Sequence, residues 1–187
     1  MTATTGLDLT AYTGTYTIDP AHTQIGFVAR HAMVTKVRGT FDDFDGTVAF
    51  DAANPAATAV RVTIQAAGIN TRNNQRDEHL RSNDFLAMEE HPQITFVSTG
   101  FRMTGDESFD LTGDLTIRGV TNTITIPFTF EGASADPFGN TRLGFEGSVA
   151  INRKDYGVSW NAALETGGFL ISDKIVLEFE VSAIKNA

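Results

Sequence analysis

Cysteine is absent from this sequence of 187 residues, which excludes disulfides, thiolate catalysis and cysteine-ligated metal sites. Tryptophan occurs once and tyrosine three times, against 14 phenylalanines. Most of the aromatic side chains therefore lack a polar group, and phenylalanine suits an oily interior better than a wet interface. This imbalance is a first indication of an apolar ligand.

Basic residues are scarce, with 14 Lys and Arg against 23 Asp and Glu, so the net charge is −9. Binding to a phosphate backbone needs clustered Lys and Arg, and the composition therefore argues against nucleic acid as a partner. The same charge argues against electrostatic docking on anionic membranes.

Long hydrophobic runs are also missing, and no stretch is long enough to be an integral membrane segment. The first 14 residues, MTATTGLDLTAYTG, contain neither a basic region nor an apolar core of the kind found in secretory signals. We therefore predict a cytoplasmic location. An exported chain whose signal had been removed would look the same.

The length fits one domain, and no linker, repeat or change of composition divides it. Residues 1–11 are rich in Thr and Ala, and we predict a disordered N-terminal tail there. Residues 12–187 are predicted to form a single barrel domain.

Apolar and polar residues alternate through most of the chain, which predicts an all-β fold. Tyr16 to Asp19 is expected to be a short edge strand, and 22–30 and 37–51 to be further strands, with Gly39 and Gly46 at bulges or bends. The alternation is cleanest after Pro92. About eight long antiparallel strands favour a barrel over a sandwich. A barrel of this size either fills itself with side chains or holds one slender ligand.

One segment interrupts the strands and predicts a short helix over about 73–88. Asn73 or Asn74 is placed to cap it, and acidic residues in its first turn with Arg81 in its last complement the helix dipole. The apolar residues Phe85, Leu86 and Met88 follow. A short helix with an apolar foot is typical of a lid or plug over a sheet, and the alternative is a connector that only covers a sheet edge.

Catalytic and metal-binding motifs are missing from the sequence. Asp77, Glu78 and His79 are the strongest candidates for a metal site or for acid–base catalysis. Consecutive helical residues point about 100° apart, so these three side chains do not converge on one atom. We predict a protein that is not an enzyme and that has no metal and no cofactor.

The apolar inner face allows two interpretations, a packed core or a hydrophobic bore. Seven phenylalanines alternate with outward polar residues and suit a narrow tube: Phe27, Phe96, Phe109, Phe128, Phe130, Phe145 and Phe179. The residues alone leave the choice open.

Several motifs together resemble the YceI-like family of bacterial lipid-binding proteins. The most specific are residues 76–82 (RDEHLRS), residues 113–121 (GDLTIRGVT), and Asn152-Arg153 followed by Asp155-Tyr156-Gly157. Thr17-Ile18-Asp19, His31-Ala32-Met33 and Gly39-Thr40-Phe41 belong to the same pattern. The match spans about residues 14–184. Tyr16 departs from it, because the family often has Trp near this position.

The resemblance implies a lipocalin-like barrel whose bore accommodates a long isoprenoid chain, such as a polyprenyl phosphate or an isoprenoid quinone, for storage, transport or sequestration. It also implies a homodimer. The residues expected to line the tunnel are Phe27, Phe41, Phe85, Leu86, Met88, Phe96, Phe109, Leu111, Phe128, Phe130, Phe145, Trp160 and Phe179. Contacts to the head group are expected from His31, Arg76, His79 and Arg81.

Two alternatives remain at this point. A lipid isomerase or cyclase would use the barrel as a reaction chamber and would need inward polar residues that converge. A filled barrel would act as a dimerisation module and would have no continuous cavity.

Overall fold

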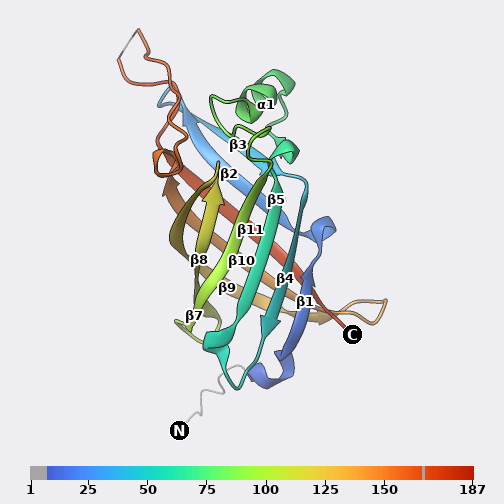
Figure 1. The fold of residues 1–187 in the computed structure, drawn as a ribbon. Coiled ribbons are helices and arrows are strands. Elements are labelled where there is room, and N and C mark those ends of the chain that lie inside the picture. The colour runs from blue at the N-terminus through green and yellow to red at the C-terminus, as the bar shows by residue number, and fades with distance from the viewer. Residues whose placement is uncertain (1–7, 166) are drawn as a thin grey trace.

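Eight antiparallel strands form a closed ring in the computed structural model, which describes residues 8–165 and 167–187 (Figure 1). Each strand of the ring pairs with the next, and the last pairs with the first. In order around the ring they are β1 (Gly14–Ile18), β4 (Phe44–Phe50), β5 (Ala59–Gln65), β7 (Gln93–Met103), β8 (Ser108–Ile117), β9 (Val120–Ala135), β10 (Thr141–Asn152) and β11 (Lys174–Lys185). The predicted eight-stranded antiparallel barrel is confirmed.

Three further strands, β2 (Gln24–His31), β3 (Thr35–Phe41) and β6 (Ile69–Asn70), extend the sheet beyond β11 at one end of the barrel. Both β1 and β2 pair with β11, so they lie along one line that the short 3-10 helix Pro20–His22 interrupts. The run predicted over 37–51 is likewise divided, since residues 42 and 43 separate β3 from β4.

The prediction that the segment around Tyr16 forms an edge strand is wrong. β1 pairs with β4 on one side and with β11 on the other, and Tyr16 is 1% exposed. Closure of a barrel removes the edges that an open sheet would have. A strand that is short and N-terminal in sequence is therefore interior to this sheet.

Gly39 and Gly46, predicted to lie at bulges or bends, are not at bulges, because the strand register runs unbroken through both positions. The register shifts instead between Ser98 and Gly100 and between Gly144 and Phe145. Both predicted glycines make room for side chains. A β-carbon on Gly39 would collide with the Phe27 ring, and one on Gly46 would lie 2.5 Å from Ile18 Cδ1.

The predicted helix begins where expected and ends earlier. α1 spans Asn74–Arg81, and the Asn73 side chain caps it by accepting a hydrogen bond from the Arg76 amide. Ser82 takes an extended conformation and ends the helix, so residues 82–88 are turns and not helix. Asp77 lies in the first turn and Arg81 in the last, as the dipole argument predicted.

The first residues that the structure describes already take part in the fold. Leu9–Tyr12 form a short 3-10 helix, so regular structure starts three residues before the expected boundary at residue 12. Residues 1–7 of the predicted tail lie outside the described residues. Three more 3-10 helices occur at Pro55–Ala57, Ala66–Gly68 and Arg153–Tyr156.

The apolar core lies inside the ring and consists of the inward positions that the alternation predicted. On β9, for example, Ile124, Ile126 and Phe128 face inward while the intervening Thr125 and Pro127 are exposed. Within residues 8–165 and 167–187, no helix combines the length and apolar character needed to cross a bilayer.

Candidate functional site: an apolar cavity inside the barrel

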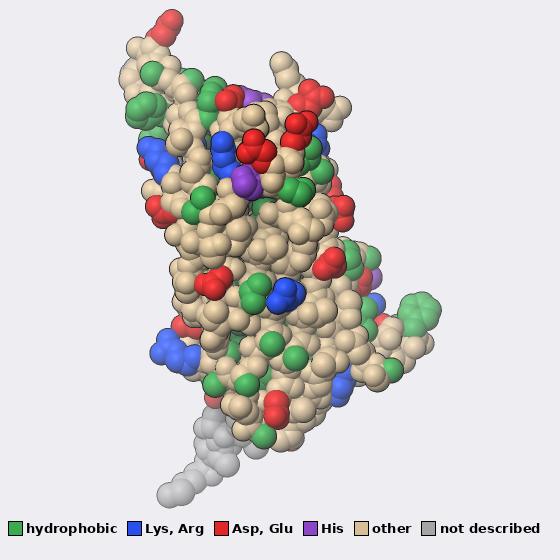
Figure 2. All heavy atoms as spheres, viewed as in Figure 1, with side chains coloured by type: hydrophobic (Ala, Val, Ile, Leu, Met, Phe, Trp, Pro, Cys, Tyr) green, Lys and Arg blue, Asp and Glu red, His purple; other side chains and the backbone are tan. Residues whose placement is uncertain are grey.

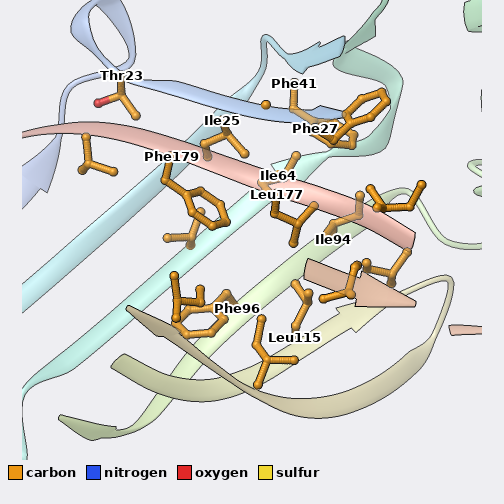
Figure 3. Close-up of a pocket in the computed structure, with 18 of the residues that line it drawn as sticks. Thr23, Ile25, Phe27, Phe41, Ile64, Ile94, Phe96, Leu115, Leu177 and Phe179 are labelled. Atoms are coloured by element: carbon orange, nitrogen blue, oxygen red, sulfur yellow. The ribbon is translucent and has the colours of Figure 1, made fainter. Parts of the chain in front are cut away.

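A cavity of about 950 Å³ occupies the centre of the barrel. Its wall is built from the inward side chains of the ring strands together with β2 and β3, and Figure 3 shows residues such as Ile25, Leu115 and Phe179 pointing into it. Ligand pockets in proteins usually measure about 300–1,000 Å³, so this one is at the large end of the range. Most of the lining side chains are apolar.

Several inward side chains keep accessible surface even though they lie deep in the barrel. Leu177, Phe179 and Ile124 face the interior of the ring, yet all three are only partly buried. In a barrel filled by its own side chains, such positions would be fully covered. The remaining exposure is surface that faces the cavity.

The phenylalanines of the wall lie against glycines of neighbouring strands. A β-carbon on Gly147 would come within 2.6 Å of the Phe128 ring, and one on Gly113 would collide with the Phe96 ring. The rings also contact one another. Phe109 stacks on Phe128 with centroids 5.5 Å apart and an interplanar angle of 18°. The rings therefore follow the wall and leave the centre of the bore open.

Three rings form a cluster at the end of the cavity below α1. His79 of α1 meets Phe85 at a centroid distance of 4.9 Å and Trp160 at 4.7 Å, and Phe85 lies 5.4 Å from Trp160. Trp160 belongs to the long connection between β10 and β11. The cluster thus joins the helix to a segment that is distant in sequence and covers part of the cavity end.

The polar atoms of α1 mostly bind the chain that precedes it. Arg76 donates from Nε to the Thr71 hydroxyl and from Nη2 to the Thr71 carbonyl, at 2.7 and 2.8 Å. Buried Asp77 accepts from the backbone amide and the hydroxyl of the same threonine. Arg81 donates to the carbonyls of Ala67 and Ile69. These hydrogen bonds attach α1 to residues 67–71, which precede it in the chain.

Arg153 is a buried cation in the cavity lining that the sequence analysis did not assign to the site. Its guanidinium donates to the carbonyls of Val158, Trp160 and Ser172, and Asp173 lies 3.7 Å from Nη2. Burial lowers the pKa of Arg153, and Asp173 partly offsets that effect. Its position within the Asn152-Arg153 motif was the signal that could have identified it.

The charged residues of the lining lie at the two ends, and the ends differ in sign. The lining at the α1 end includes Arg30, Arg76 and Arg153, together with His31 and His79. The lining at the other end includes two exposed carboxylates from the turn between β7 and β8, Asp106 and Glu107. The middle of the cavity has apolar walls, so a bound molecule meets basic groups at one end and acidic groups at the other.

Most residues that the sequence placed in the tunnel do line the cavity. These are Phe27, Phe41, Phe85, Leu86, Phe96, Phe109, Leu111, Phe128, Phe130, Phe145, Trp160 and Phe179. Met88 is not part of the lining; it follows Ala87, whose positive φ of 47° turns the chain after Leu86. Tyr12, Phe50 and Phe101 line the cavity but were not predicted.

Of the four predicted head-group residues, His31, Arg76 and His79 line the cavity, while Arg81 does not because its guanidinium is bonded to the backbone carbonyls described above. His79 Nε2 is 2.8 Å from Asp84 Oδ2. The side chains of Asp77, Glu78 and His79 diverge: Asp77 is buried on Thr71, and Glu78 is exposed. Among the residues that the structure describes, no group of three His, Asp or Glu is arranged to hold a metal ion.

Comparison with protein families matches residues 16–183 to the model of the YceI-like domain. A UPF0312 protein of Azotobacter vinelandii is 42% identical over 145 residues, which cover 76% of each chain. The protein YceI of Escherichia coli O6:H1 is 44% identical over 137 residues, covering 73% of this chain and 71% of the relative.

Solved structures show the same barrel. BcnA of Burkholderia cenocepacia superposes with a TM-score of 0.77 at 25% identity, over 88% of this chain and 98% of that one. A YceI protein of Campylobacter jejuni gives 0.72 at 30% identity, over 84% and 90%. A domain from Saccharophagus degradans, described as polyisoprenoid binding, gives 0.70 at 15% identity, over 91% and 98%, which is a likeness of fold.

Proposed function

This chain belongs to the YceI-like family, and from that membership and its cavity we propose that it binds a long isoprenoid lipid inside the barrel. The observation that carries the proposal is the continuous apolar cavity of about 950 Å³, whose inner side chains keep exposed surface. An apolar chain placed there removes that surface from water, which is the dominant favourable term in such binding.

The size and shape of the cavity suit a long chain. A group the size of a water molecule occupies about 30 Å³, so the cavity has room for roughly thirty carbon-sized groups. The Saccharophagus degradans neighbour is described as polyisoprenoid binding. Because it shares only 15% identity, the argument for this chain comes from its own apolar wall.

The polarity of the cavity ends supports one orientation of the lipid. A polar or anionic head, such as the phosphate of a polyprenyl phosphate or the ring of an isoprenoid quinone, would lie at the α1 end near Arg76, His79 and His31. A charge-assisted hydrogen bond from Arg76 would favour an anion. The tail would then extend toward Asp106 and Glu107, with its end near the opposite opening.

The proposed role is storage, transport or sequestration of the lipid without catalysis. An isomerase or cyclase would need polar side chains that converge in the middle of the cavity, where the walls are apolar. A filled dimerisation module is difficult to reconcile with a cavity of this volume. The homodimer and the cytoplasmic location expected from the sequence stay predictions.

The first experiment is to purify the protein from cells, extract it with organic solvent and identify the extract by mass spectrometry. The delipidated protein is then titrated with a polyprenyl phosphate and with an isoprenoid quinone. Stoichiometric isoprenoid in the extract, or saturable binding of either added lipid, is the expected result. An extract free of lipid together with no binding would refute the proposal.

A pair of tryptophan substitutions tests whether binding occurs inside the barrel. Leu177→Trp places a large ring in the cavity, whereas Thr129→Trp places the same ring on the exposed outer face. We expect Leu177→Trp to weaken lipid binding at least tenfold and Thr129→Trp to leave it unchanged. Equal affinities for the two variants would place the lipid elsewhere.

A further inference from the structure

The rim of the barrel at the α1 end carries an exposed apolar surface made by two segments. Met33 and Val34, in the turn between β2 and β3, are 62% and 75% exposed, and Phe169, in the connection between β10 and β11, is 57% exposed. Figure 2 shows hydrophobic side chains gathered on the loop that projects at the upper left. We call Met33, Val34 and Phe169 the apolar rim.

The two segments are held together and join the cavity directly. The Ala32 amide donates to the Leu170 carbonyl at 2.7 Å, His31 forms a β-bridge with Ile171, and Gly168 lies beside Met33. His31, Leu170 and Ile171 line the cavity. The apolar rim is therefore continuous with the wall of the lipid cavity.

The turn that presents Met33 is built at an energetic cost. The Val34 amide donates a hydrogen bond to the His31 carbonyl and closes the turn. The two residues between them, Ala32 and Met33, have φ values of 51° and 61°. Two successive positive φ angles in a hairpin turn favour Asn-Gly strongly, and bulky side chains are disfavoured there. Backbone strain of this kind suggests a function that depends on the side chain.

Cations flank the apolar rim. Arg30 on β2 and Lys36 on β3 are directly opposite each other. The amide of Ser172 donates a hydrogen bond to the Arg30 carbonyl, which places Lys174, two residues after Ser172, on the same side of the rim. Arg30, Lys36 and Lys174 are exposed, and among the described residues none of them has a carboxylate within 4.0 Å.

We propose that the apolar rim docks on the surface of a lipid bilayer that contains anionic lipids, with the α1 end of the cavity facing the membrane. The three apolar side chains would enter the interface, and Arg30, Lys36 and Lys174 would lie at the level of the anionic head groups. The inference rests on the proposed function, because docking would give a membrane lipid its route into the cavity.

The net charge of −9 argues against such docking when it is treated as a property of the whole molecule. At physiological ionic strength, however, charges are screened over about 8 Å, so the cations beside the rim act on a nearby surface more strongly than charges farther from it do. The exposed carboxylates Glu78, Asp84, Glu89 and Glu90 lie at the same end of the barrel but on α1 and the turns after it, not on the two segments of the rim (Figure 1). Three carboxylates lie in the connection between β10 and β11: Asp155 and Glu165 are exposed, and Asp173 is paired with Lys154.

The test measures flotation of the full chain with vesicles of phosphatidylcholine and with vesicles of phosphatidylcholine containing phosphatidylserine. We expect binding that is stronger to the anionic vesicles and weaker at high salt. The double substitution Ala32→Asn with Met33→Gly gives the turn its preferred residues, so the variant should be at least as stable as the wild type. We expect it to bind vesicles at least tenfold more weakly.

Two further variants separate the contributions. Arg30→Gln should weaken binding to anionic vesicles about fivefold, since one cation near an anionic surface contributes a factor of that order. Phe138→Ser is the matched control, because Phe138 is 87% exposed in the turn between β9 and β10, at the opposite end of β10. We expect it to bind like the wild type.

The contrary outcomes are distinct. Equal vesicle binding by the wild type and the double variant, or no binding by either, would overturn the docking surface. A wild-type dimer that the double variant dissociates, with no change in vesicle binding, would assign the rim to a second copy of this chain. Lipid extracted from the same preparations is measured in parallel, so loss of docking with lipid retained is distinguishable from failure of the proposed function.

Discussion

Glycines and phenylalanines on the inner wall act in pairs across neighbouring strands. Phe27 covers Gly39, Phe96 covers Gly113, and Phe128 covers Gly147. A ring that lies over a glycine covers the strand and stays out of the centre of the bore. The alternation along each strand predicted that these phenylalanines face inward, but their pairing with glycines depends on the register between strands, which the sequence does not show.

Gly147→Ala tests this arrangement. The new methyl group would meet the Phe128 ring at 2.6 Å and the Pro127 carbonyl at 2.8 Å, so the ring must move toward the centre. We expect a loss of about 1–3 kcal/mol in the free energy of unfolding, the usual cost of overpacking, and weaker binding of long lipids.

Gly144→Ala on the same strand is the control for that change. Its methyl group would have only ordinary contacts, at 3.7 Å from Glu131 Cβ and 3.9 Å from the Gly132 carbonyl. Chemical denaturation and lipid titration of both variants are compared with the wild type. Equal stability of the two variants would contradict the role assigned to the ring and glycine pair.

Arg142 forms an ion pair with two carboxylates near the turn between β9 and β10. It donates to Asp19 at 2.7 Å and to Asp136 at 2.9 Å. The hydrogen bond from Arg142, followed by that from His22, lowers the pKa of Asp19 from 3.8 to about 2. Hydrogen bonds from Asn140, and then from Arg142, lower the pKa of Asp136 to about 2.

These shifts predict how stability depends on pH. Because both pKa values are lower in the folded protein, the carboxylates stabilise the fold fully above about pH 4, and that contribution is lost as the pH falls through about 2. In Arg142→Gln we expect the pKa of Asp19 to rise toward 3.8, while Asp136 stays low because Asn140 still donates to it. Carboxyl titration by NMR measures both. An unchanged pKa of Asp19 in the variant would refute the assignment.

At the scale of elements, α1 is the part of the fold that depends most on residues close to one another in the sequence. The Asn73 cap and the charges of the first and last turns are sequence neighbours, so the start of the helix could be predicted. The prediction of its end was wrong, although Ser82, Asn83 and Asp84 are residue types that favour caps and turns over helix interiors. The turns over residues 82–88 also depend on contacts with the barrel, which the sequence does not show. One such contact is the hydrogen bond from Arg118 to the Phe85 carbonyl. The lid interpretation remains a prediction.

Arg81→Gln tests whether α1 behaves as a lid. The substitution removes charged donors from the carbonyls of Ala67 and Ile69, and we expect the free energy of unfolding to fall by about 1–2 kcal/mol. Amide exchange should quicken over residues 74–88 more than in the ring strands, and bound lipid should dissociate several-fold faster. Arg72→Gln, at an exposed position before the helix, is the control. Unchanged lipid release in Arg81→Gln despite faster exchange would show that α1 is a connector.

At the scale of the whole molecule, closure of the ring is the feature that sequence reasoning reached only in part. Strand number and inward faces follow from local alternation. The pairing of β1 with β11 joins residues 16–18 to 183–185, and nothing local distinguishes such a strand from an edge. The cavity could not be predicted from local patterns either, because its volume depends on the placement of every inward side chain. Only the family resemblance predicted an open bore.

The volume of the cavity predicts how affinity depends on the length of the lipid. Each buried methylene contributes about 0.8 kcal/mol, so the Kd of an isoprenoid alcohol for the delipidated protein should fall about fourfold for each added carbon that enters the cavity. The affinity should stop increasing at about thirty carbons, the length at which the cavity is full. Leu177→Trp shortens the accessible bore, and its plateau should come at a shorter chain. Titration of a length series with both proteins measures the two plateaus. If Kd did not depend on chain length, or if both proteins reached their plateau at the same chain length, the tail would not lie in the barrel.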